Sequence, residues 1–232
     1  MDPRHLYFDE RLNGGCAYCG GQADTRDHVP SRVLMDKPYP SNLPVVGACN
    51  RCNNGFSRHE RMVACLVDCA MWGGTEAPEL RPKVRRMLTE DGLLAREVQC
   101  VLHSGAARLA EHESVGVVVN KLANGHHSYL EFRSDVPISA VRVATRLDMG
   151  EEHLSNFEQL PGGQLFPEIG TRGFVNAVKG LGGPPQSGEV SVESSGWTVV
   201  QPGRYRYAAI HYSRRTALRF VLSEYLYCEV SW

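Results

Sequence analysis

Two matched cysteine pairs are the feature of this chain that most constrains its fold. Cys16 and Cys19 stand in GGCAYCGG, and Cys49 and Cys52 stand in GACNRCNN. Each C-x2-C turn directs two sulfurs to one side, so two such turns supply the four thiolates of a tetrahedral zinc site. A site with four protein ligands leaves no open position for a substrate. The spacing therefore predicts one structural Zn2+ per chain.

The other four of the eight cysteines do not repeat this pattern. Cys65 and Cys69 are spaced for one face of a helix, where two buried thiols are favoured over a second metal site. Cys100 and Cys228 lie in apolar runs, and we expect them in the core as well. For the paired cysteines the alternative is a redox dithiol, which normally needs a single pair in a thioredoxin-like context.

The chain has no apolar run of about 18 residues, and its N-terminal stretch lacks the apolar core of a signal peptide. We therefore expect no membrane span and a cytoplasmic protein. Its 232 residues carry 25 basic and 26 acidic side chains, a net charge of -1. That length allows one or two domains with a sizeable core. The near-neutral charge lacks the overall signature of a nucleic-acid binder, although a local basic patch is sufficient for binding.

Polar residues of a particular kind lie between and after the cysteine pairs. Asp27 and His28 precede a proline-rich loop, Asn42 stands in SNLPVV, and Asn53 follows the last paired cysteine directly. A helical apolar pattern then covers residues 56–72, with Ser57 as its expected N-cap. Glu60 would complete a capping box with that serine.

This order of cysteine pair, Asp-His, loop, Asn-Leu, cysteine pair, Asn and helix resembles the HNH nuclease family over residues 14–72. The resemblance implies a ββα-metal core that a structural zinc holds together. It also implies that His28 is the general base, that Asn42 orients the loop and the base, and that Asp27 and Asn53 bind a catalytic Mg2+ or Mn2+.

Phosphodiester hydrolysis needs a nucleophilic water, a group that takes its proton and a cation for the developing charge. Imidazole suits the second task because its unperturbed pKa is about 6.5. Asn53 replaces the last histidine of the family pattern, and an amide oxygen favours a hard ion such as Mg2+ or Mn2+. Asn54 and His59 are substitutes if the register slips. The alternative is that His28 is a structural or surface histidine and that Asn42 and Asn53 are residues of ordinary turns, where asparagine is favoured.

Arginines near the proposed site and near the C-terminus are candidates for phosphate contacts. The stretch from Gly203 to Ser223 contains five arginines and no acidic residue. Strand alternation in RYRYAAIHY would place its first two arginines on one face and its tyrosines on the other. A solvated sheet face over a tyrosine-containing core is an equal alternative. The candidate nucleic-acid-binding residues are Arg51, Arg58, His59, Arg204 and Arg206.

We expect an α+β protein. Residues 1–75 would form a zinc-stapled ββα-metal (HNH) module, and residues 76–232 would add helices and a mainly antiparallel sheet, with a role in substrate or partner binding. Residues 83–99 read as a helix, and the stretch 108–123 reads as either a strand or a helix. From Ser128 onward the pattern turns to strands, interrupted by a loop-rich stretch over 149–189.

The function expected from the resemblance is a metal-dependent endonuclease that hydrolyses DNA, with double-stranded DNA favoured and bacterial defence against phage as a setting. The alternative is a catalytically inactive, zinc-stapled module that binds nucleic acid or protein. Asn53 and the neutral charge of the N-terminal part motivate that alternative. A homodimer or a partner subunit would supply binding that a neutral module lacks.

Overall fold

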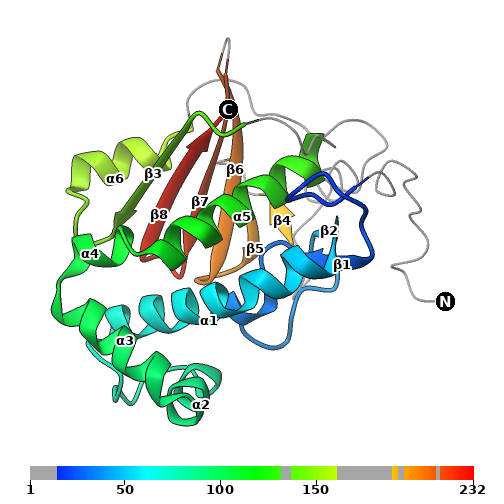
Figure 1. The fold of residues 1–232 in the computed structure, drawn as a ribbon. Helices are drawn as coiled ribbons and strands as arrows, with labels where there is room; N and C mark the ends of the chain where they lie inside the picture. The colour runs from blue at the N-terminus through cyan, green and yellow to red at the C-terminus, as the bar shows by residue number, and fades with distance from the viewer. Residues whose placement is uncertain (1–14, 132–136, 161–189, 193–195, 213–214) are drawn as a thin grey trace.

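The computed structural model describes residues 15–131, 137–160, 190–192, 196–212 and 215–232 (Figure 1). Residues 1–14 of the expected N-terminal module, residues 161–189 of the expected loop-rich stretch, and Arg214 lie outside the described residues. The helices are α1 (Asn50–Trp72), α2 (Pro82–Glu90), α3 (Gly92–His103), α4 (Ala106–Ala110), α5 (Glu113–Glu131) and α6 (Glu151–Glu158), and η3 (Arg32–Leu34) is a 3-10 turn. The strands are β1 (Thr25–His28), β2 (Val45–Ala48), β3 (Ala140–Thr145), β4 (Ser191–Val192), β5 (Thr198–Gln201), β6 (Tyr205–Tyr212), β7 (Arg215–Leu222) and β8 (Leu226–Ser231). The α+β class is confirmed.

A six-stranded antiparallel sheet forms the C-terminal part, in the order β3-β8-β7-β6-β5-β4. Side chains along its strands point alternately to the two faces of the sheet, and both faces are covered. On one face, Tyr205, Tyr207 and Phe220 join the main hydrophobic core, and α5 crosses this face with α1 alongside it (Figure 1). On the other face, Trp197 and Tyr227 pack against residues of α6. The antiparallel sheet expected of the C-terminal strands is therefore confirmed.

The hairpin of β1 and β2 is a separate two-stranded sheet at one end of α1 (Figure 1). Its register pairs Asp27 with Val46 and His28 with Val45. One hydrophobic cluster nevertheless runs from Ala17 beside the hairpin to Val230 in the last strand. The boundary drawn at residue 75 stays a prediction, and described residues on both of its sides share this core.

Four expectations for local structure are wrong. The helix after the second cysteine pair begins at Asn50, with Cys49 as its N-cap, so Ser57 lies inside it. The helix expected over 83–99 is divided at Asp91, whose side chain caps α3. Residues from Ser128 continue α5 rather than starting a strand. Cys100 is exposed on α3, whereas Cys65, Cys69 and Cys228 are buried as expected.

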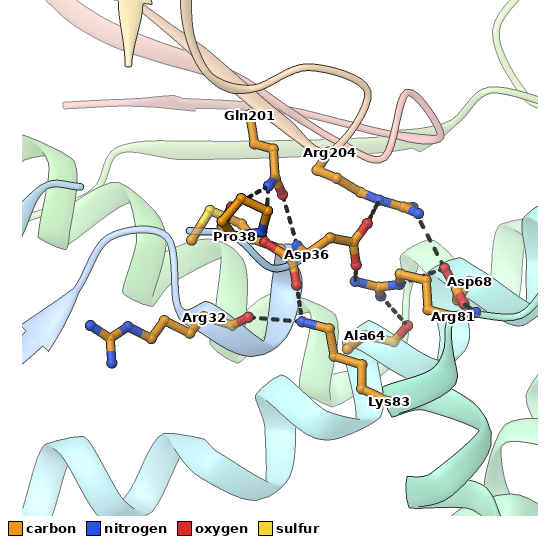
Figure 2. A network of polar contacts seen from close by, with 10 residues as sticks. Arg32, Asp36, Pro38, Ala64, Asp68, Arg81, Lys83, Gln201 and Arg204 are labelled. Carbon is orange, nitrogen blue, oxygen red and sulfur yellow. Dashed lines mark hydrogen bonds and ion pairs between the residues drawn. The ribbon is translucent and has the colours of Figure 1, made fainter. Parts of the chain in front are cut away.

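An ion network joins α1, the start of α2 and the loop between η3 and β2 to the residue before β6 (Figure 2). Asp68 of α1 is fully buried and accepts hydrogen bonds from the backbone N and the Nε of Arg81, at 2.9 and 2.8 Å. Arg204 donates from Nε to Asp36 at 2.5 Å and lies 3.7 Å from Asp68. We call Asp36, Asp68, Arg81 and Arg204 the Arg81 cluster. Its two carboxylates and two guanidinium groups balance in charge.

Two further contacts beside this cluster hold the loop that carries Asp36 (Figure 2). Gln201 accepts from the backbone N of Asp36 at 2.7 Å and donates to its carbonyl oxygen at 2.9 Å. Lys83 donates to the carbonyl oxygens of Arg32 and Met35. Burial and the neighbouring Arg81 lower the pKa of Lys83 to about 8. None of the described helices is long and apolar enough to cross a membrane.

Candidate functional site

The four paired cysteines come together beside the hairpin. Their Sγ atoms all lie within 4.8 Å of one another, and those of Cys19 and Cys49 are 3.8 Å apart. Zn–S bonds of about 2.3 Å give an S···S edge of roughly 3.8 Å in a tetrahedron, so this separation fits a bound zinc. The group can hold a structural metal such as zinc, as the spacing predicted. Cys65 and Cys69 belong to no such group among the described residues.

Both cysteine pairs sit in backbone that turns tightly. In the first, Gly20 donates its N–H to the carbonyl of Cys16 at 2.9 Å and has a φ of +71°, which favours glycine. In the second, the backbone N–H of Cys52 donates to the Cys49 sulfur at 3.4 Å. This hydrogen bond, with that from the Cys52 side chain, lowers the pKa of Cys49 to about 7. The thiolate that a metal binds is thereby favoured.

Asp24 and Thr25 fix the start of α1 against β1. The Asp24 carboxylate accepts from the backbone N of Asn50 at 2.6 Å and from its side chain at 3.0 Å. Asn53, in the first turn of α1, donates from Nδ2 to the Thr25 hydroxyl at 3.3 Å. Because residues two apart in a strand point to the same face, Asn53 lies against the face of β1 that carries Asp27.

Asp27 lies in a buried polar cluster. Its Oδ2 accepts a hydrogen bond from the Tyr18 hydroxyl and forms an ion pair with the Lys121 ammonium, both at 2.7 Å. Lys121 also donates to Glu60 and, at 2.7 Å, to the Ser31 hydroxyl, and Ser31 itself donates to Glu60. Burial and then the Asp27 charge raise the pKa of Tyr18, so the phenol stays protonated and donates. We call Tyr18, Asp27, Ser31, Glu60 and Lys121 the Lys121 cluster.

Lys121 reaches this cluster because α5 packs closely on the hairpin. Gly125 follows Lys121 by one helical turn and therefore shares its face. A Cβ at Gly125 would lie 2.7 Å from Cγ2 of Val29, the residue after β1, so only glycine permits this approach. Lys121 is not among the site residues predicted from the sequence. A signal was present, since this lysine interrupts the apolar run VGVVVNKLA.

His28 is half-buried at the end of β1. Strand alternation directs Asp27 and His28 to opposite faces, and the exposed Arg26 lies on the same side as His28. The roles of Asp27 as a metal ligand and of His28 as the general base stay predictions. His28 lies on the more accessible face of the hairpin.

Asn42 ties the loop between the cysteine pairs to the edge of the large sheet. Its Oδ1 accepts from the backbone N of Val190 at 2.8 Å, and its Nδ2 donates to the carbonyl of the same residue at 3.4 Å. Val190 directly precedes β4. The role of Asn42 in orienting a base stays a prediction, and a role in holding the loop is observed.

The basic residues on α1 divide into two kinds. Arg51 is exposed, and the exposed Arg58 lies 3.6 Å from Glu97, a contact that solvent weakens. His59 is half-buried, and its Nδ1 lies 3.1 Å from the Ser114 hydroxyl at the start of α5. Arg51 and Arg58 are therefore accessible to a phosphate, whereas His59 contributes to the contact between the two helices.

The expectation that Arg204 and Arg206 share one face is wrong, because Arg204 pairs with Asp68 of α1 and Arg206 with Glu158 of α6. Arg204 precedes β6 and belongs to the Arg81 cluster. Arg206 donates to Glu158 at 2.6 and 2.7 Å and to Glu224 at 2.8 and 2.9 Å, and its guanidinium lies 4.4 Å from the Trp197 ring centroid. Acidic residues from other segments thus pair with both arginines. Nucleic-acid binding by either arginine stays a prediction.

Comparison with known proteins adds no relative: no family model, no curated protein and no solved structure matches this chain.

Proposed function

We propose that the chain is a metal-dependent endonuclease of the HNH type that hydrolyses phosphodiester bonds of DNA, with double-stranded DNA as the favoured substrate. The observation that carries the proposal is one arrangement. A short hairpin bearing Asp27 and His28 packs against the first turn of α1, which bears Asn53, beside the four-cysteine group. Bacterial defence is the setting that the family resemblance suggests.

In this proposal His28 takes the proton of the attacking water. Its place at the end of β1, on the more accessible side of the hairpin, allows contact with a bound strand. Arg51 and Arg58 are exposed on the first turns of α1 and would contact the DNA backbone. The zinc would hold the hairpin and the helix start together and take no part in the reaction, because four thiolates fill its coordination.

Asp27 and Asn53 fit a hard divalent ion in type and in place. A carboxylate and an amide oxygen are ligands that Mg2+ and Mn2+ accept, and both residues face the same side of β1. When bound there, the ion would stabilise the charge that develops on the scissile phosphate. The ion pair with Lys121 and the hydrogen bond from Tyr18 are both made to Oδ2 of Asp27.

A second candidate function is a catalytically inactive, zinc-stapled module that binds nucleic acid or protein. Two observations favour it. The Lys121 ammonium already neutralises Asp27, and alternation along β1 separates Asp27 from His28. Both candidates share the zinc site and differ only in whether the hairpin carries out hydrolysis.

Nicking of supercoiled plasmid by the zinc-loaded full chain separates the two candidates. We expect cleavage with Mg2+ or Mn2+ and none with chelator. His28→Ala should lower the rate by about 100-fold or more while zinc content is kept. His153→Ala, an exposed histidine on α6, is the matched control and should cleave normally. Binding of DNA with no cleavage in either Mg2+ or Mn2+ would favour the inactive module.

A further inference from the structure

The Lys121 cluster is buried yet unbalanced in charge. The Lys121 side chain is 1% exposed, and those of Asp27 and Glu60 are 9% and 10% exposed. One ammonium therefore faces two carboxylates in a region that water barely reaches. An uncompensated buried charge is costly. The excess negative charge indicates that the cluster attracts a further cation.

Lys121 has enough other partners to stay in place if Asp27 turns to such a cation. It also donates to Glu60 and to Ser31. Its Nζ also lies 5.3 Å from the ring centroid of Phe56 and 5.8 Å from that of Tyr18. Aromatic rings at such distances stabilise an ammonium.

We propose that Lys121 is the resident cation of the Asp27 carboxylate and that it yields this carboxylate to a divalent ion while it stays bound to Glu60 and Ser31. Lys121 is then a positioning residue that sets the affinity for the ion. The inference rests on the proposed function, because that function names Asp27 as a ligand of the divalent ion.

Lys121 and Glu60 should act on this affinity with opposite signs. The ammonium lies 2.7 Å from Oδ2 of Asp27 and repels a second cation at the same carboxylate. Glu60 is the alternative partner that draws the ammonium away from Asp27. If the two residues had a purely structural role, their substitution would not change the ion affinity in opposite directions.

Binding of Mn2+ to the zinc-loaded full chain tests the inference without any reaction. Free Mn2+ is measured by electron paramagnetic resonance during a titration without DNA. We expect Lys121→Met to tighten Mn2+ binding by about tenfold and Glu60→Gln to weaken it by about fivefold, since one unit charge changes within a few ångströms. Asp27→Asn should abolish the tight site.

Because Lys121→Met leaves two buried carboxylates together, the double variant Lys121→Met with Glu60→Gln is the control for folding. It keeps the formal charge of the wild-type cluster and should still bind Mn2+ more tightly than Glu60→Gln alone. Zinc content and Tm verify each sample. Affinities within twofold of wild type in these folded variants, or weaker binding in Lys121→Met, would overturn the inference.

The plasmid assay on the same samples separates this inference from the proposed function. Opposite Mn2+ shifts in samples that never cut DNA would support the Lys121 assignment and reject the nuclease. Cleavage by proteins whose Mn2+ affinities do not move would reject the Lys121 assignment alone. Full Mn2+ binding by Asp27→Asn would overturn the assignment of Asp27 and with it that of Lys121.

Discussion

The Lys121 cluster and the Arg81 cluster are both ion networks that include a residue of α1, and they differ in charge balance. In the Arg81 cluster two guanidinium groups meet two carboxylates, with a contact at 2.8 Å at its centre. In the Lys121 cluster one ammonium meets two carboxylates. A balanced network suits the joining of segments, whereas an unbalanced one beside a predicted metal ligand marks a candidate site. Under the proposed function, the Arg81 cluster has a structural role and the Lys121 cluster serves the metal site.

Removal of the metal from the four-cysteine group should produce the largest difference in stability between the two clusters. Structural zinc contributes about 10 kcal/mol or more to small zinc-bound folds, and β1 lies between the two cysteine pairs. Chelation should therefore release Asp27 and the Lys121 cluster while the Arg81 cluster persists. Hydrogen exchange measures this as a loss of amide protection in β1 and β2 before β7 and β8.

Elemental analysis should accompany that experiment and give one zinc per chain. A hairpin that keeps its amide protection after the metal is removed would contradict the role of the cysteines. Simultaneous loss of amide protection in both sheets would show that the two clusters depend equally on the bound metal.

Loss of Asp68 should give the next largest effect. Asp68→Ala leaves the guanidinium of Arg81, 5% exposed, without its closest carboxylate, and an uncompensated buried charge costs about 3–5 kcal/mol. Asp36→Ala is the matched control. Its side chain is 36% exposed, so we expect a loss of roughly 1 kcal/mol. Urea denaturation measures both, and equal losses would contradict a cluster centred on Asp68.

Sequence reasoning reached the parts of the molecule that short-range patterns determine. The cysteine spacing predicted the metal-binding group, and the strand-like pattern of the C-terminal part predicted its mainly antiparallel sheet. The start of α1 was missed because its first turn is largely exposed, so its apolar pattern begins only at Phe56. The cap at Cys49 depends on a sulfur that the sequence presents first as a metal ligand.

The contacts around the candidate site were out of reach for a different reason. Lys121 lies 90 positions from Ser31 and 61 from Glu60, and the close packing at Gly125 that brings it there depends on tertiary structure. The partner of Arg206 on α6 is likewise 48 positions away. Ion pairs of this kind leave no periodic pattern in a sequence.

A third buried group, His126 of α5, should make the free energy of unfolding fall in acid. We expect this effect to be smaller than those of metal removal and of Asp68→Ala. The Nε2 of His126 lies 2.8 Å from the Tyr205 hydroxyl, and its Nδ1 has no partner among the described residues. Burial lowers the pKa of His126 to about 3. The unfolded chain binds this proton below about 6.5 and the folded protein does not, so stability falls as the pH drops from 6.5 towards 3.

Between pH 7 and pH 5 we expect a loss of roughly 2 kcal/mol in the free energy of unfolding from His126. His126→Gln cannot titrate and should lack this part of the pH dependence, while effects of acid on the thiolates remain common to both proteins. Urea denaturation at the two pH values measures the difference. Parallel losses in wild type and variant would show that His126 does not account for this pH dependence.

Chemical rescue of His28→Ala is the most direct test of the central claim that this hairpin hydrolyses DNA. The assay follows plasmid nicking in Mn2+ by the zinc-loaded variant, with and without added imidazole. If His28 takes the proton of the attacking water, imidazole should restore nicking to His28→Ala and should leave Asp27→Asn inactive. Nicking by His28→Ala at the wild-type rate without imidazole, or no nicking by the wild-type protein itself, would contradict the account.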